Sequence, residues 1–172
     1  MAELIPMAKK RRLRAASLEW EEFEKFLETL QKESDRGAVL ISAALLDDLL
    51  ERCMHSFLLD HSRVDQLLDN GPLGSFGARI LAAFALGMLS ESEYQDCERV
   101  RKVRNSFAHG VGCSFENQKV KDICSSFVFV AKPGALKDHG PRERYLSSVL
   151  SLLISLSRRP AELSRRRLKF VE

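Results

Sequence analysis

One stretch of the chain combines residue types suited to acid–base chemistry on a phosphate. It spans residues 99–110 and contains Arg104, Asn105 and His109. A guanidinium forks onto phosphate oxygens, and a histidine titrates near neutrality and can act as a general acid or base. Arg104 and His109 are five residues apart, so on an ideal helix they project roughly 140° apart. They therefore converge only if the last helical turn unwinds at Gly110 or a second subunit supplies one of them.

The same three residues have two interpretations. In the structural one, His109 interacts with the last carbonyls of a helix, while Arg104 and Asn105 bond to neighbouring helices and loops. The catalytic one rests on a local resemblance: the R-x4-H spacing, with asparagine directly after the arginine, resembles the signature of HEPN-domain ribonucleases. That resemblance implies a dimer in which Arg104 binds phosphate, Asn105 orients polar groups and His109 is the acid or base for attack by a ribose 2′-hydroxyl.

Two further groups of residues also have a structural and a functional interpretation. The acidic side chains at 47, 48 and 51 could face Arg101 and Arg104, as an ion-pair network or in a nuclease site. Residues 71–76, with the sequence G-P-L-G-S-F, precede an apolar helix, and backbone N–H groups at such a position can hold an anion. Their spacing is not that of a phosphate loop, so a rigid turn is the preferred interpretation.

Hydrophobic periodicity predicts the elements that must position these residues. We expect an all-α fold, a single compact bundle of five to six helices with flexible basic tails at both ends. Apolar residues recur at three- and four-residue steps between glycine, proline and capping residues. The predicted helices cover residues 17–34, 35–60, 76–86, 90–109, about 114–127 and 141–160. Residues 59–75 are expected to form a connection with at most one irregular turn.

Local signals define several of these boundaries. Gly87 is expected just beyond the end of the helix at 76–86, and Gly110 beyond the end of the helix at 90–109. Ser90 and Glu93 form an S-x-x-E capping box. Pro160 is expected to end the last helix, because a proline lacks the backbone N–H that a helix interior needs.

Charge is distributed unevenly along the chain. The formal net charge is +3, yet residues 1–16 carry five cations against one glutamate, and residues 157–172 carry six against two. Each end is therefore +4, which leaves −5 for residues 17–156. We expect a flexible basic arm at 1–16, a helical domain at 17–157 and a basic tail at 158–172. Candidate nonspecific nucleic-acid contacts are Lys9, Lys10, Arg11, Arg12, Arg14, Arg165, Arg166 and Arg167. The alternative is that the tails pair with the acidic body or a neighbouring subunit.

The cysteines form no C-x-x-C pair, which predicts reduced thiols in a core rather than disulfides or a zinc site. Cys53, His55 and His61 do not have the spacing of a zinc pattern. We therefore expect no metal and no cofactor. The longest uncharged stretch, residues 145–157, is too short to span a membrane, and the N-terminus lacks the apolar region of a secretory signal. The sequence predicts a cytoplasmic protein.

Several blocks, in order, resemble the mannitol operon repressor (MtlR-like) family. They are D-R-G-A-V-L-I-S-A-A-L-L-D at 35–47, G-P-L-G-S-F-G-A-R-I at 71–80, A-L-G at 85–87 and R-N-S-F-A-H at 104–109. The resemblance covers about residues 20–125 and does not extend to the tails. It implies a compact helical protein that regulates transcription in bacteria, in a family named for repression of mannitol uptake genes.

No pair of predicted helices has the form of a helix-turn-helix. The helix at 76–86 is too apolar to lie in a groove, and the helix at 90–109 begins with acidic residues. The first hypothesis is therefore a non-enzymatic regulator, a homodimer that acts through a protein partner such as another transcription regulator rather than by direct contact with DNA or RNA. The alternatives are a metal-independent HEPN-like endoribonuclease and nonspecific nucleic-acid binding through the tails.

Overall fold

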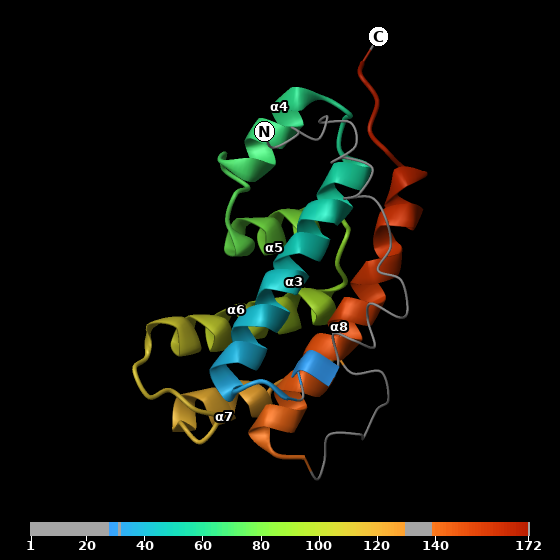
Figure 1. Cartoon of the computed structure of the whole chain (residues 1–172). Coiled ribbons are helices and arrows are strands. Elements are labelled where there is room, and N and C mark those ends of the chain that lie inside the picture. Colours follow the sequence, from blue (N-terminus) through green and yellow to red (C-terminus); the bar gives the residue numbers. More distant parts are fainter. Residues whose placement is uncertain (1–27, 31, 130–138, 172) are drawn as a thin grey trace.

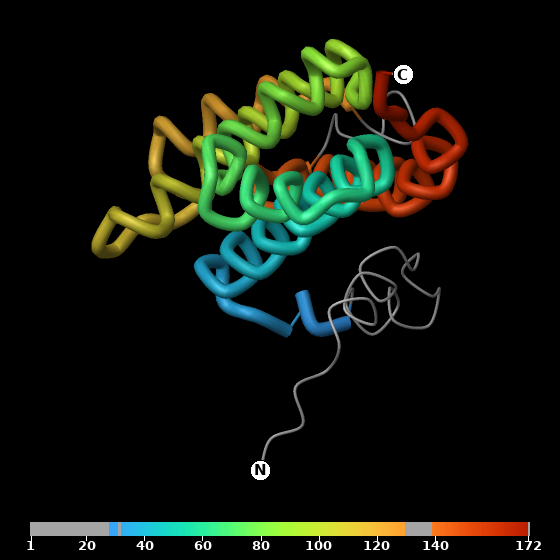
Figure 2. Tube along the Cα trace, turned by 90° about the horizontal axis from the view of Figure 1, so that it is seen from above, coloured from blue at the N-terminus to red at the C-terminus, as the bar shows by residue number. Residues whose placement is uncertain are grey.

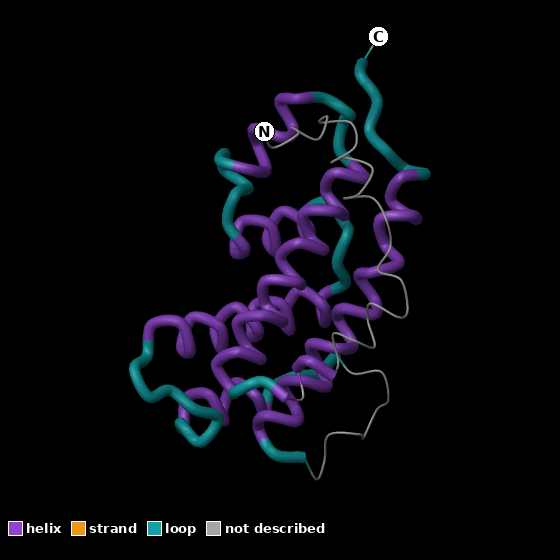
Figure 3. The backbone as a smooth tube through the Cα atoms, viewed as in Figure 1, coloured by secondary structure: helices purple, strands orange, loops and turns teal. Residues whose placement is uncertain are grey.

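The structure is a computed structural model that describes residues 28–30, 32–129 and 139–171. The fold is all-α, as predicted, and no strand occurs in the described residues (Figures 1 and 3). The helices are α3 (Asp35–Phe57), α4 (Ser62–Asp69), α5 (Phe76–Ala85), α6 (Glu91–His109), α7 (Gln118–Ser125) and α8 (Pro141–Ser164). The predicted arm at 1–16 and most of the predicted helix at 17–34 lie outside the described residues.

Helices α3 and α8 form the centre of the bundle. They lie side by side and run in the same direction (Figure 1), and their mutual contact is the most extensive in the fold. Helix α5 covers one side of α3 (Figure 2), and α6 contacts α3, α5, α7 and α8. Since α6 carries residues 99–110, this packing determines where the candidate site lies. None of the helices described is long and apolar enough to cross a membrane.

The core is closed around Tyr145 at the start of α8. Its side chain is fully buried, and its hydroxyl lies 3.0 Å from Ser42 Oγ. The rings of Phe115 and Phe127 pack on Tyr145 with centroid distances of 5.6 and 6.1 Å. Burial raises the pKa of Tyr145 and outweighs the opposite effect of the bond with Ser42. These contacts hold the segments on both sides of α7 against α8.

Most of the predicted helix ends are confirmed. Ser90 and Glu93 form the capping box that begins α6, and Gly110 is the C-cap that ends it. Gly87 follows α5 with a φ of +69°, a left-handed conformation that favours glycine. Helix α7 begins later than predicted, because Asn117 accepts a bond from the backbone N–H of Lys119 and caps it.

The prediction of a connection over residues 59–75 is wrong, because α4 forms within it. The His61 ring accepts a hydrogen bond from Arg63 N at 3.1 Å and caps this helix. Leu68 is fully buried and anchors the helix to the core. The eight residues of α4 include only three apolar ones, too short a pattern to establish a helical period.

The predicted helix end at Pro160 is also wrong. Helix α8 continues to Ser164, so Arg158 and Arg159 are helical residues rather than part of a tail. Pro160 removes one backbone hydrogen bond close to the end of the helix. That loss is offset by burial, because both Pro160 and Leu163 are buried against the bundle.

Candidate functional site

Arg104, Asn105 and His109 lie together at the C-terminal end of α6. Arg104 Nη1 donates to Asn105 Oδ1 at 3.0 Å. Asn105 and His109 line one hollow of about 400 Å³ between the end of α6 and the loop to α7. Arg104 is exposed and is not among the residues that line this hollow. The chain therefore brings Asn105 and His109 together and leaves Arg104 beside them.

The last turn of α6 does not unwind. The helix extends through His109, and Gly110 N donates to Ser106 O at 2.9 Å, a regular helical bond. Of the two conditions that would make Arg104 and His109 converge, unwinding is therefore not met. Convergence of the pair requires the second condition, a second copy of the chain.

A second hollow of about 430 Å³ adjoins the first. The two share Asn105, Ser106 and Lys119, so they form one continuous depression, which we call the α6–α7 groove. None of the described residues that line the two hollows is a carboxylate. The lining residues are Lys102, Asn105, Ser106, His109, Gly110, Val111, Gly112, Cys113, Asn117, Lys119 and Ile123. The sequence pattern indicated Asn105 and His109, whereas Lys119 comes from a different helix and was missed.

The direct ion-pair partner of Asp47 and Glu51 on α3 is Arg79 of α5, whereas Asp48 pairs with Arg52 on α3 itself. Arg79 Nη1 lies 2.7 Å from Asp47 Oδ1, and Arg79 Nη2 lies 3.0 Å from Glu51 Oε2. Arg101 pairs instead with Glu98 on its own helix, at 2.7 Å. Burial, assisted by the nearby charge of Glu51, raises the pKa of Asp47, although Arg79 and the more distant Arg104 act to lower it. The signal for Arg79 in the sequence is a lone charge within an otherwise apolar helix.

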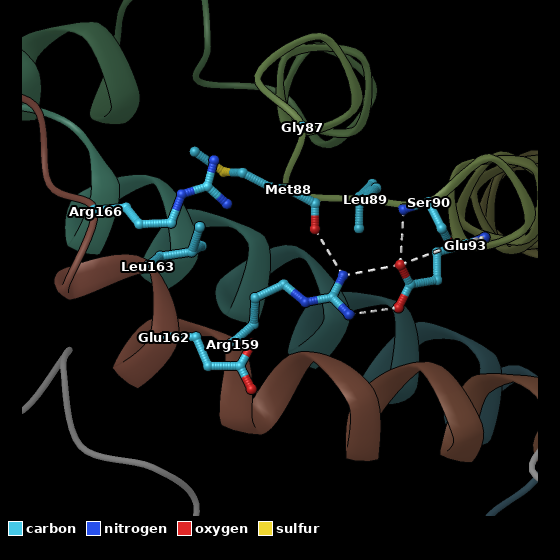
Figure 4. Close-up of a pocket in the computed structure, with 9 residues that line it drawn as sticks. All are labelled: Gly87, Met88, Leu89, Ser90, Glu93, Arg159, Glu162, Leu163 and Arg166. Atoms are coloured by element: carbon cyan, nitrogen blue, oxygen red, sulfur yellow. Dashed lines mark hydrogen bonds and ion pairs between the residues drawn. The ribbon is translucent and has the colours of Figure 1, made fainter.

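The N-terminal half of α6 is held by a buried ion pair that connects it to α8 (Figure 4). Arg159 makes two parallel bonds of 2.8 Å to the carboxylate of Glu93, and it also donates to Met88 O at 2.6 Å. Ser155 Oγ and Ser90 N donate to the same carboxylate at 2.7 and 2.8 Å. The two ions neutralise each other, so the pair fixes the position of α6 against α8. It also lines a hollow of about 380 Å³, together with residues 87–90 and Arg166.

A buried aspartate on α6 holds the segment that follows α7. Asp96 is fully buried, and its carboxylate accepts bonds from Val128 N at 3.0 Å and from Phe129 N at 2.7 Å. Arg99 pairs with the same carboxylate. The backbone of residues 128 and 129 is held in this way by bonds to a side chain rather than to another strand.

Of the C-terminal candidate residues, Arg167 lies at the end of α3. Arg167 donates to Ser56 O at 3.1 Å and to His55 O at 2.9 Å, so it satisfies carbonyls at the end of that helix. Arg165 and Arg166 are exposed. The N-terminal candidates, Lys9 to Arg14, lie outside the described residues.

The cysteines are free thiols, and three of the four are buried. Burial raises the pKa of Cys53 and of Cys124 to about 12. Among the described residues, no three His, Cys, Asp or Glu side chains are grouped so that they could hold a metal ion. A side chain at Gly71 would come within 2.5 Å of Gln66 O, which supports the interpretation of residues 71–76 as a rigid turn.

Fold and site together define a small helical protein with charged pairs inside its core and a cationic groove on its surface. The model of the mannitol repressor family matches residues 22–160, and the chain belongs to this family. The match confirms the resemblance noted in the sequence and extends it to Pro160. No curated protein and no solved structure matches the chain.

Proposed function

We propose that the chain is a cytoplasmic transcription regulator that works as a homodimer through contact with another protein. The observation that carries this proposal is the family match over residues 22–160, which includes every described helix from α3 to α7 and most of α8. A protein partner, such as another transcription regulator, would then supply the contacts to DNA bases.

The connections and charges of the described helices support contact with DNA through a partner protein rather than directly. A helix-turn-helix joins its two helices by a turn of about three or four residues, and only α3 and α4 among the described helices are joined by so few, residues 58–61. Around α4, Arg63 is accompanied by Asp60, Asp65 and Asp69, which is a poor balance for a helix that must lie against phosphates.

A reporter gene under the control region of mannitol uptake genes tests the proposal. We expect the full chain to lower reporter expression in cells, while the purified chain gives no sequence-selective shift of the same DNA at physiological salt. Selective binding by the purified chain alone would contradict the proposal. Nonspecific binding should fall steeply with salt and be lost when residues 1–16 are removed and Arg165, Arg166 and Arg167 are changed to glutamine.

A metal-independent endoribonuclease is the second candidate. It is favoured by the bond between Arg104 and Asn105 and by the shared hollow of Asn105 and His109. In such an enzyme Arg104 would bind the phosphate, Asn105 would orient it and His109 would transfer the proton. A second copy of the chain would have to complete the site.

Cleavage of mixed RNA in the presence of a chelator decides between the two candidates. A ribonuclease should cut RNA under these conditions, and the His109→Ala variant should not. His139→Ala is a matched control, since His139 is exposed just before α8 and does not line the α6–α7 groove. Circular dichroism must show equal folding of all three proteins. Absence of cleavage by the unchanged chain would eliminate the enzyme.

A further inference from the structure

The α6–α7 groove carries cations that the chain itself leaves unpaired. Lys102 and Lys119 line it together with His109, and none of these three side chains forms a hydrogen bond or ion pair within the described part of the chain. Neighbours on the same helices behave differently. Arg101 pairs with Glu98 at 2.7 Å, and Lys121 pairs with Glu116 at 2.6 Å. The positive charge of the groove is therefore available to a ligand.

Neutral hydrogen-bonding groups lie between these cations. Asn105 accepts from Arg104 through its Oδ1, which leaves its amide N–H groups free to donate. Ser106 Oγ donates to Lys102 O at 3.1 Å and keeps its lone pairs as acceptors. The lysine side chains can bind an anionic group, and the side chains of Asn105 and Ser106 can bind hydroxyl groups. The groove therefore suits a ligand that carries both an anionic group and hydroxyl groups.

The dimensions of the groove favour a small molecule over a nucleic acid. Its two hollows, about 400 and 430 Å³, each fall within the range typical of small-ligand sites. Proteins that bind single-stranded nucleic acid stack bases on aromatic side chains, and His109 is the only aromatic ring among the lining residues described.

We infer that the α6–α7 groove binds a small phosphorylated compound that carries several hydroxyl groups. Lys102 and Lys119 hold the phosphate, and Asn105 and Ser106 bond to hydroxyls. The further statement that this compound is the effector of a regulator rests on the proposed function, whereas binding itself does not.

Calorimetric titration of the full chain tests the inference, with glucose 6-phosphate, glucose and inorganic phosphate as probes. We expect saturable binding of glucose 6-phosphate, weaker binding of inorganic phosphate and none of glucose. The Lys102→Gln/Lys119→Gln variant should bind glucose 6-phosphate at least about tenfold more weakly, because it lacks both charge-assisted contacts. Lys121→Gln removes a lysine from the same helix as Lys119 but outside the groove. The affinity of this variant for glucose 6-phosphate should therefore equal that of the unchanged chain.

Alkylation of Cys113 provides a second readout. This thiol lines the groove and is partly exposed, while the other three cysteines are buried. Saturating glucose 6-phosphate should slow alkylation of Cys113 in the unchanged chain. In the Lys102→Gln/Lys119→Gln variant, the same concentration of glucose 6-phosphate should leave the rate of Cys113 alkylation unchanged.

Four results would overturn the inference: no binding of glucose 6-phosphate, equal binding by the double variant, equal binding of glucose, or binding of single-stranded RNA alone. These are distinct from failure of the proposed function. A chain that represses the reporter but binds no phosphorylated probe would refute the groove assignment only. A chain that binds the probe through Lys102 and Lys119 but does not repress would refute the regulator only.

Discussion

Glu93 on α6 is a carboxylate with only 3% of its surface exposed, yet it stays ionised. Burial acts to raise the pKa of Glu93, but bonds from Arg159, Ser90 and Ser155 outweigh it and lower that pKa to about 2. The same bonds join α6 to α8, so an electrostatic property of one residue has a structural consequence for two helices.

Removal of one partner from this pair should be strongly destabilising. We expect Arg159→Gln to lower the free energy of unfolding by about 3–5 kcal/mol, because it leaves the charge of Glu93 buried without its counterion. Arg101→Gln is the matched control, since the pair of Arg101 with Glu98 lies nearer the surface and contributes about 1 kcal/mol or less. Urea denaturation measures both, and equal losses would show that the buried pair has no special role.

Glu93 should also account for part of the loss of folding stability at acid pH. Because its pKa is about 2 in the folded chain and 4.5 ordinarily, the carboxylate stabilises the fold above pH 4.5, and this is lost as the pH falls toward 2. The loss amounts to roughly 3 kcal/mol. In the Glu93→Gln variant, the free energy of unfolding should fall less steeply with decreasing pH than it does in the unchanged chain. Glu162→Gln, at an exposed carboxyl, should keep the slope of the unchanged chain.

Thiol reactivity should distinguish Cys113 from the other cysteines. Burial raises the pKa of Cys53, Cys97 and Cys124, and it also blocks access to them. At pH 8 we expect a disulfide reagent to modify Cys113 first, with the other three reacting only when urea unfolds the chain. Mass spectrometry of the modified peptides identifies the site, and rapid labelling of Cys97 in the folded chain would contradict this.

At the scale of helices, the sequence allowed the prediction of elements with long apolar patterns. Helices α3, α5 and α6 lie close to where periodicity and the Ser90 cap predict them. Helix α4 and the end of α8 were not predictable in this way. Each depends on a few buried side chains, Leu68 and Leu163, whose environment comes from residues far away in sequence.

The candidate site was predictable only in part, for the same reason. Asn105 and His109 stand in one helix, so their spacing shows that they share a face. Lys119 belongs to α7 and reaches the groove through the loop between the helices, and no local pattern contains that information. The partners of Arg79 were likewise hidden, because they depend on how α5 packs against α3.

The part of α8 beyond Pro160 should contribute measurably to stability. Leu163 is 4% exposed and Leu168 is 44% exposed, so the same substitution at both positions compares core with surface. We expect Leu163→Ala to cost about 2–5 kcal/mol of unfolding free energy. Leu168→Ala should cost less than about 1 kcal/mol. Similar values in thermal or urea unfolding would mean that α8 ends at Pro160 in solution.

At the scale of the whole molecule, the folded unit extends beyond both the predicted domain at 17–157 and the family match that ends at residue 160. Three backbone carbonyls at the end of α3 receive bonds from the last residues of the chain, two from Arg167 and one of 2.8 Å from Leu168 N. Unsatisfied carbonyls at a helix end are costly when they are shielded from water. The C-terminal segment therefore belongs to the bundle, although its charge suggests a solvated tail.

A pair of truncations follows from this boundary. Deletion of residues 161–172 removes Leu163 from the core together with all three bonds to the end of α3, and we expect it to lower the unfolding free energy by at least about 3 kcal/mol. Deletion of residues 171 and 172 alone removes none of these contacts and should leave stability unchanged. Hydrogen exchange adds a local test, because only the longer deletion should speed exchange in the last turn of α3. If both deletions are neutral, the folded unit ends where the family match does.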